Sequence, residues 1–261
     1  MLKDITIGQY FPGDSILHRL DPRAKLIAVF LYIVALFVNS SWLANAVMPI
    51  LTIILMAVSG IPPRHILRGL RPMLFIILLT GILNLFFTKG TPVLPGWIIT
   101  WEGISQTIKM MLRITMLIIG TFLLTYTTSP MQITDGLEYL LSPLKRLHVP
   151  VHELTLIMSM ALRFIPTLIE ETDKIMSAQK SRGADFETGG LVQRAKALIP
   201  VLVPLFVSSF RRADELAVAM ESRCYHGGEG RTRMHELVYT RRDIVAICLA
   251  VALLGLLIIL R

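Results

Sequence analysis

Uncharged apolar runs alternate with charged segments along the chain. The longest run, residues 26–63, contains no Asp, Glu, Lys or Arg, and Asn39-Ser40-Ser41 interrupts it near its middle. A membrane-spanning helix needs about 20 apolar residues, so this run predicts two short spans joined by a tight turn. Three later runs predict one span each. The five expected spans cover about 25–40, 43–59, 72–88, 108–128 and 243–261.

The segment between the fourth and fifth spans has a different pattern. Residues 129–242 hold most of the charge, yet apolar residues recur there at the three- and four-residue spacing of an amphipathic helix. Arg163 stands in the middle of one such stretch, which makes a membrane-spanning interpretation costly. The pattern predicts three helices, over about 131–147, 152–181 and 191–222.

Prolines and one cap residue set limits on the expected helices. Pro166 should bend the second amphipathic helix, and Pro200 and Pro204 should interrupt the third. Asp21-Pro22 fits the start of the first membrane helix, with Asp as the N-cap and Pro at the first helical position. We therefore expect a membrane part (1–128), a platform of amphipathic helices (129–242) and a final span (243–261).

Composition supports the membrane interpretation. Of the 261 residues, 54% are hydrophobic and only 17% are charged, whereas soluble domains carry about 25% charged residues. A disordered chain would combine low hydrophobicity with high charge. The two cysteines, Cys224 and Cys248, fall in a polar and an apolar segment, so no disulfide framework is expected.

The basic residues are distributed unevenly around the expected spans. The formal net charge is +8, and 22 of the 26 Lys and Arg residues fall on one side if the N-terminus is cytoplasmic. Because cytoplasmic loops of membrane proteins are rich in Lys and Arg, we expect a cytoplasmic N-terminus and an external C-terminus. This distribution explains the positive charge without a nucleic-acid partner.

The two long amphipathic helices end in similar tripeptides. The first ends in Ser181-Arg182-Gly183 and the second in Ser222-Arg223-Cys224, 41 residues later. An Arg near a helix C-terminus is common because the helix dipole favours a cation there, so the repetition matters more than either site alone. An Arg between small residues can enter a groove and bind a partner carboxylate with both arms of its guanidinium. Two such anchors suit a partner with two equivalent grooves, such as a dimer.

Few residues suit catalysis or metal binding. The interiors of the apolar runs lack the ionisable residues that ion-coupled carriers use. His148 and His152 lie four residues apart beside Glu153, but Pro150 between them favours loop histidines over a metal pair. No G-x-x-x-x-G-K-[ST] phosphate-binding sequence occurs, so ATP hydrolysis would need separate subunits. We expect no catalytic residue, no metal site and no cofactor.

Several short motifs together resemble one family. They are Gly8-Gln9-Tyr10-Phe11-Pro12-Gly13, Asp21-Pro22-Arg23, the two Arg tripeptides and Gly227-Gly228. Over essentially its whole length the chain resembles the transmembrane T component of energy-coupling factor (ECF) importers, the EcfT/CbiQ-type family. The coupling motif of that family is Ala-Arg-Gly, whereas this chain has Ser for Ala twice and Cys for the second Gly.

The resemblance implies a fold and a mechanism. The fold would be an L-shaped, all-α integral membrane protein with about five transmembrane helices and three long cytoplasmic or interfacial coupling helices, two of them crossing in an X. Such a non-catalytic component lies in a prokaryotic cell membrane. It joins two cytoplasmic ABC ATPases of the EcfA type, expected as a heterodimer, to one exchangeable membrane S component. It passes ATP-driven motion to the S component for uptake of vitamins or other micronutrients. The intact N-terminal signatures favour the type shared by several S components over the dedicated cobalt type.

Two groups of residues receive roles in this interpretation. The ATPase-coupling residues would be Ser181, Arg182, Gly183, Ser222, Arg223 and Cys224. The residues facing the S component would be Leu154, Met158, Leu162, Leu198, Leu202 and Phe206.

Other classes stay open from the sequence. A conventional ABC importer permease would also bind ATPases, but its spans should be lined by polar residues. A channel lined by polar backbone is a further alternative. A membrane enzyme would need acidic or His residues clustered at the membrane interface, and the expected spans show no such cluster at their ends.

Overall fold

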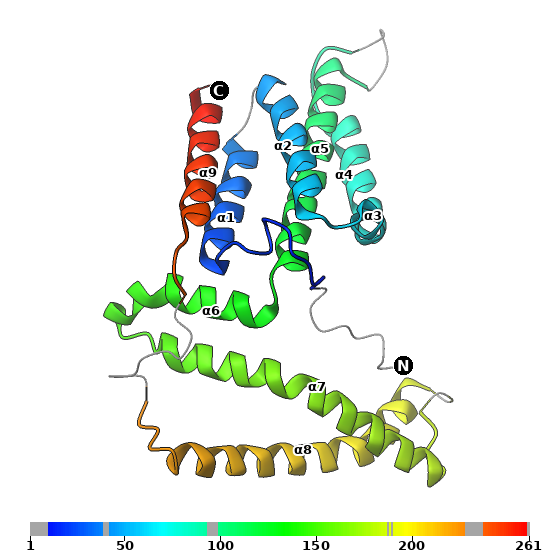
Figure 1. Cartoon of the computed structure of the whole chain (residues 1–261). Coiled ribbons are helices and arrows are strands. Elements are labelled where there is room, and N and C mark those ends of the chain that lie inside the picture. Colours follow the sequence, from blue (N-terminus) through cyan, green and yellow to red (C-terminus); the bar gives the residue numbers. More distant parts are fainter. Residues whose placement is uncertain are drawn as a thin grey trace. The chain divides into compact units, whose positions relative to one another are not determined.

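The structure, a computed structural model, describes residues 10–38, 42–92, 99–186, 188, 190–227 and 237–259. Throughout these ranges the regular elements are helices, and an isolated β-bridge joins Pro92 to Thr100. The chain divides into two compact units. We call residues 8–140 with 236–261 the bundle unit and residues 141–235 the arm unit; Figure 1 shows the helices of both. The turn expected at Asn39-Ser40-Ser41 lies outside the described residues.

Helix α5 (Trp101–Thr127) is the centre of the bundle unit. It contacts α1, α2, α3 and α4, while α9 packs against α1. α5 begins seven residues before the expected span, because Thr100 caps it by accepting a hydrogen bond from the Gly103 N–H at 3.0 Å. The other elements of the unit are α1 (Pro22–Val38), α2 (Trp42–Ser59), α3 (Pro63–Leu70), the 3₁₀ turn η2 (Arg71–Met73), α4 (Leu74–Phe87), α6 (Pro130–Leu141) and α9 (Arg241–Ile259).

The bundle core brings α1, α2, α5 and α9 together. Tyr32 of α1 is buried against Met48, Met116 and Leu257. The Tyr32 hydroxyl is hydrogen-bonded to the hydroxyl of Thr52 at 2.7 Å, so its polar group is satisfied within the apolar core. Helix α5 can approach this ring because residue 120 is a glycine: a Cβ there would lie 2.6 Å from Tyr32.

The exterior of the bundle unit is strongly apolar. On α4 the side chains of Phe75 and Phe87 are 73% and 79% exposed. Soluble monomers rarely expose large contiguous apolar patches, whereas a lipid environment favours them. Among the described residues five helical stretches are long and apolar enough to cross a membrane: Pro63–Phe87, Trp101–Thr127, Val151–Ser181, Val192–Glu221 and Arg241–Ile259. The chain is therefore an all-α membrane protein.

Length and composition select different helices from those the sequence predicted as spans. They include Val151–Ser181 and Val192–Glu221, which we expected outside the membrane, and they leave out α1 and α2. Helix α1 has 17 residues, and the apolar stretch counted in α2 is Asn45–Ser59, so both are at the short end for a span. Both of these longer helices also carry charged residues, such as Arg163 in Val151–Ser181 and Arg211 in Val192–Glu221.

The arm unit consists of a 3₁₀ turn and two long helices. These are η3 (Ser142–Leu147), α7 (Val151–Ser181) and α8 (Leu191–Glu221). Two predictions were wrong. The helix expected over 131–147 is α-helical only to Leu141, because Pro143 lies in the following turn and the chain then tightens into η3. Pro200 and Pro204 do not interrupt α8, since each removes only one backbone donor from a long helix.

Candidate functional site

The C-terminus of α7 is closed by two backbone hydrogen bonds, one nested within the other. The Ala184 N–H donates to the Gln179 carbonyl at 3.0 Å, and the Gly183 N–H donates to the Lys180 carbonyl at 3.0 Å. This is the Schellman arrangement, which requires a left-handed residue after the helix. Gly183 supplies it with a φ of +88°, and Arg182 directly precedes it.

The C-terminus of α8 repeats this geometry. The Tyr225 N–H donates to the Met220 carbonyl at 3.0 Å, and the Cys224 N–H donates to the Glu221 carbonyl at 2.9 Å. Cys224 has a φ of +58°, so it occupies the left-handed position that Gly183 holds in α7. A residue with a Cβ pays about 1–2 kcal/mol there. Arg223 therefore matches Arg182 in backbone geometry as well as in sequence.

We call the two helix ends, Ser181-Arg182-Gly183 and Ser222-Arg223-Cys224, the arginine tips. Their arginine side chains are accessible from outside the chain. Arg182 and Arg223 are exposed, and neither guanidinium makes a hydrogen bond or ion pair with another residue in the described ranges. The neighbouring hydroxyls are used locally: Ser181 donates to the Ser177 carbonyl at 3.1 Å, and Ser222 donates to a carbonyl one turn earlier at 2.9 Å. The structure thus brings the six predicted coupling residues into two similar tips, not one site.

The two tips lie at opposite ends of the α7–α8 pair. The helices run in opposite directions and contact each other part-way along, and Figure 1 shows the end of α7 and the end of α8 pointing apart. At the contact Arg212 Nη2 lies 2.8 Å from Glu171 Oε2. These two residues are 41 positions apart, the same separation as Arg182 and Arg223.

The predicted apolar face is largely exposed. Phe206 is 63% exposed and Leu154 is 52% exposed, and Met158, Leu198 and Leu202 are also exposed, whereas Leu162 is half-buried. Phe210 is 69% exposed on the same helix as Phe206. Helix α8 therefore presents apolar side chains that the described part of the chain leaves uncovered.

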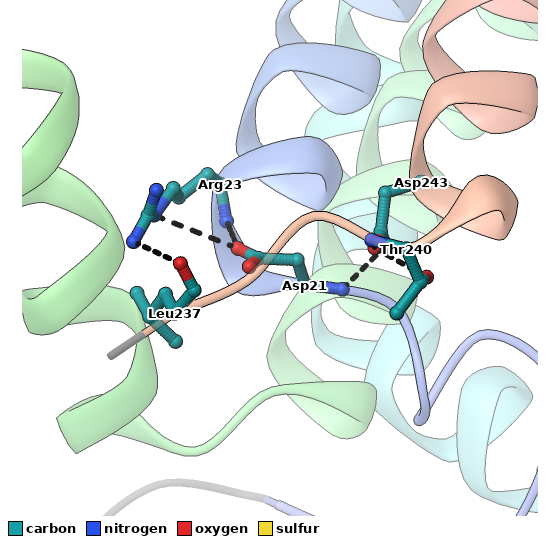
Figure 2. A network of polar contacts seen from close by, with 5 residues as sticks. All are labelled: Asp21, Arg23, Leu237, Thr240 and Asp243. Atoms are coloured by element: carbon teal, nitrogen blue, oxygen red, sulfur yellow. Dashed lines mark hydrogen bonds and ion pairs between the residues drawn. The ribbon is translucent and has the colours of Figure 1, made fainter. Parts of the chain in front are cut away.

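A buried carboxylate joins the starts of α1 and α9 in the bundle unit (Figure 2). Asp243 is 1% exposed. Its Oδ1 accepts the Asp21 N–H at 2.7 Å, and its Oδ2 accepts the Thr240 N–H at 2.7 Å and the Thr240 hydroxyl at 2.6 Å. Sequence reasoning missed this residue. Thr240-x-x-Asp243 before an apolar run is a capping-box pattern and could have indicated it.

The charged residues of the Asp21-Pro22-Arg23 signature are also buried. The predicted N-cap is confirmed: Asp21 Oδ1 accepts the Arg23 N–H at 2.9 Å. The Arg23 guanidinium donates to the Leu237 carbonyl at 3.0 Å and lies 3.4 Å from the centre of the Tyr139 ring. Lys25 donates from Nζ to the Thr127 carbonyl at 2.9 Å at the end of α5. Together with Lys25, the signature therefore ties the start of α1 to the end of α5 and to the segment before α9.

The Tyr10–Gly13 signature forms a loop held at the same helix end. The Phe11 N–H donates to the Tyr126 carbonyl at 2.9 Å. His18 Nε2 donates to the Phe11 carbonyl at 2.9 Å, and its Nδ1 accepts from the Ser15 hydroxyl at 2.6 Å. A Cβ at Gly13 would lie 3.0 Å from the His18 ring. Gly8, Gln9 and Gly228 of the other signatures lie outside the described residues.

Metal-binding groups do not gather in the described part of the chain, where no three His, Cys, Asp or Glu side chains come together. His148 ends η3 in a left-handed conformation, with a φ of 60°, and His152 lies in the first turn of α7.

Comparison with known proteins places the chain in a family. Residues 13–235 match the model of the CbiQ family, described as cobalt transport protein. The energy-coupling factor transporter transmembrane protein EcfT of Ruminiclostridium cellulolyticum is 54% identical over 248 residues, covering 94% of this chain and 92% of the relative. The EcfT of Clostridium kluyveri is 52% identical over 265 residues, covering 100% and 98%, and that of Bacillus subtilis is 48% identical over 264 residues, covering both chains fully. The chain thus belongs to the CbiQ/EcfT family of energy-coupling factor transporter transmembrane proteins.

Proposed function

We propose that this chain is the non-catalytic coupling subunit of an ECF-type importer. Its two tips would bind two cytoplasmic ATPase subunits of the EcfA type, and its apolar surfaces would bind one exchangeable membrane S component. The observation that carries the proposal is the matched pair of helix ends, each closed by the same two hydrogen bonds and each presenting an exposed arginine.

The spacing of the tips supports a dimeric partner. Arg182 follows Glu171 by eleven residues, and Arg223 follows Arg212 by eleven residues. At a rise of 1.5 Å per residue, each tip lies roughly 16 Å from the contact between the arms. Because equivalent residues of the two arms meet at that contact, the tips are related by a local pseudo-two-fold axis. An ATPase pair, including a heterodimer of similar subunits, offers two grooves related in the same way.

The charged residues of the arm helices α7 and α8 favour a position of these helices outside the hydrocarbon core of the membrane. Helix α7 carries Arg163 and the cluster Glu170-Glu171-x-Asp173-Lys174, and α8 carries Arg211-Arg212-x-Asp214-Glu215. Each such charge costs about 2.5–3.5 kcal/mol at the centre of a membrane helix. We therefore assign the spans to α1, α2, α4, α5 and α9, and place the arm helices α7 and α8 on the cytoplasmic side.

The same assignment predicts an orientation for the termini. The buried network places the start of α1, the end of α5 and the start of α9 at one end of the bundle unit. Basic residues gather at the elements of this end, namely Arg19, Arg64, Arg68, Arg71, Arg241 and Arg242. Lys109, near the start of α5, instead lies over Trp42 at the start of α2, with 4.9 Å from Nζ to the centre of the ring. By the positive-inside rule the basic end is cytoplasmic, so the N-terminus lies inside and the C-terminus outside.

The exposed apolar residues of the arms would receive the S component. Large uncovered side chains such as Phe206 can pack against different apolar partners without specific polar contacts, and Met158 adds a flexible contact. One subunit could therefore serve several S components, each specific for a vitamin or another micronutrient. A conventional ABC permease with its own translocation path is the alternative.

A pull-down from the native membrane tests this proposal. The tagged chain, extracted in mild detergent, should bring down two different Walker-A ATPases and one or more small apolar proteins, which mass spectrometry would identify. Recovery of a self-sufficient oligomer, or of one ATPase with a periplasmic-type binding protein, would overturn the proposal in favour of a channel or a conventional permease.

A further inference from the structure

The apolar contact between α7 and α8 does not by itself fix the register of the two helices, that is, their relative position along the helix axes. Phe164 and Leu168 of α7 line a groove with Ala213, Leu216 and Ala217 of α8. Apolar burial is non-directional, and the apolar positions of α8 recur at intervals of three and four residues. A slide of one helical turn would therefore replace one apolar contact by another of similar kind.

One polar contact breaks this degeneracy. Glu171 Oε2 accepts a hydrogen bond from Arg212 Nη2 at 2.8 Å, with side-chain exposures of 23% for Glu171 and 35% for Arg212. The Ser208 hydroxyl and then Arg212 stabilise the charged form and lower the pKa of the Glu171 carboxyl. Ser208 and Arg212 lie one turn apart on α8, so the carboxylate meets donors from two consecutive turns.

The contact is too weak to hold the arms together by itself. Partly exposed ion pairs contribute about 0–1 kcal/mol, much less than the packed apolar side chains beside it. Its directionality is what distinguishes it, because a slide of one turn would leave two half-buried charges without each other. Buried or half-buried polar groups are known to select one register between packed helices.

The position of the contact links the register to the tips. Glu171 and Arg212 are 41 residues apart, as are Arg182 and Arg223, so each tip lies eleven residues beyond its own member of the pair. A slide of one turn would change the tip-to-tip separation by about 5.4 Å. Two rigid grooves on a partner could then not both be occupied.

The contact leaves another movement free. One guanidinium nitrogen bonds one carboxylate oxygen, and Arg212 Nε has no hydrogen-bond partner among the described residues. A single-point contact opposes sliding but allows the angle between the helices to change, whereas a bidentate clamp would oppose both. We propose that Glu171 and Arg212, with Ser208, form a register pin: positioning residues that keep both arginine tips at equal reach while the crossing angle changes. This inference rests on the proposed function for its purpose, but the pin itself is a property of the chain.

Spin-label distance measurement on the full chain in nanodiscs tests the pin without any partner. The spin labels are attached at Ser177→Cys and Val218→Cys, because both positions are exposed, lie near the two tips and are 41 residues apart. Cys224→Ser and Cys248→Ser remove the native thiols. Glu171→Arg and Arg212→Glu should each shift the separation by about 5 Å or add a second population at that shift. The double charge swap should restore the single wild-type distance.

Two neighbouring residues supply matched controls. Glu170→Arg and Arg211→Glu make the same charge changes one residue away on exposed positions, and neither should move the distance. If a reversed charge prevents expression, Glu171→Gln and Arg212→Gln replace the reversals. They should produce the same shift or second population in the distance. An unchanged single distance in both pin variants would overturn the inference.

Uptake by the assembled importer gives the second readout. Each single reversal should lower substrate uptake about tenfold, and the double swap should bring it back to within about twofold. Because the distance is measured on the isolated chain, a failure of the pin and a failure of the proposed function give different results. If the pin variants show the expected shift in distance but no ATPases appear in the pull-down, the register pin stands and its proposed purpose is overturned.

Discussion

Arg23 in the bundle unit and the arginines at the arm tips are the same residue type in opposite settings. Arg23 is 4% exposed, bonded to the Leu237 carbonyl and stacked on Tyr139. Arg182 and Arg223 are exposed and unpaired within the described ranges. A buried charge held by such contacts supports the fold, and its loss leaves the groups around it uncompensated. An exposed arginine on a rigid helix end contributes little to folding and is available for recognition. The comparison separates a signature that stabilises the fold from one that we propose binds a partner.

The largest effect should come from breaking the buried network. Asp243→Ala leaves the Asp21 N–H buried without an acceptor and removes the cap of α9. Removing one member of a buried charged network costs about 3–5 kcal/mol. The midpoint of thermal unfolding in detergent should fall sharply, and less protein should accumulate in the membrane. A midpoint like that of the wild type would show that the network does not stabilise the bundle.

The tips should show the opposite behaviour. Arg182→Glu and Arg223→Glu should leave thermal unfolding unchanged while weakening ATPase binding. A hydrogen bond to a charged group contributes about 1.5–3 kcal/mol, so affinity should fall by about 10- to 100-fold per tip. Co-purification of the ATPases measures this loss. Arg211→Glu, an exposed reversal away from the tips, is the control and should retain them.

Close packing in the bundle predicts an intermediate effect. Gly120→Ala puts a Cβ 2.6 Å from the Tyr32 ring, and overpacking of this kind costs about 1–3 kcal/mol. Gly255→Ala in α9 meets nothing within 4 Å and should be neutral or stabilising by up to about 1 kcal/mol. Thermal unfolding of the two variants compares them directly. Equal midpoints would mean that the α1–α5 approach does not need glycine.

The smallest effect concerns the asymmetry between the tips. Cys224→Gly should stabilise the end of α8 by about 1 kcal/mol, because glycine adopts the left-handed conformation without strain, and Gly183→Cys should destabilise the end of α7 by a similar amount. Hydrogen exchange at the Tyr225 and Ala184 amides, which close the two caps, measures both changes. Faster exchange at Tyr225 in Cys224→Gly would contradict this explanation.

Local signals predicted much of the fold. Asp21-Pro22 gave the start of α1 because capping depends on adjacent residues, and the positions of Arg182 and Arg223 at helix ends followed from where the apolar periodicity stops. The binding role of these arginines stays a prediction. Periodicity also showed that residues 191–222 form one amphipathic stretch, but proline rules led to a break that the structure does not have.

Long-range pairing was beyond the sequence. The Asp21 N–H and the Asp243 carboxylate are 222 residues apart, and no periodic pattern connects them. Glu171 and Arg212 lie 41 residues apart on two different long helices, so their contact too depends on tertiary packing. The left-handed conformation of Cys224 followed from neither the residue type nor its neighbours, since cysteine rarely occupies that region.

Photo-crosslinking at the tips would test most directly whether they bind two equivalent ATPase grooves. A photoreactive amino acid replaces Ser181 in one variant and Ser222 in another, and each is illuminated in native membranes. We predict that each position crosslinks to an ATPase subunit and that the two positions reach different subunits of the pair. Crosslinks only to lipid or to other copies of this chain, or the same single ATPase site from both positions, would contradict the proposed coupling role.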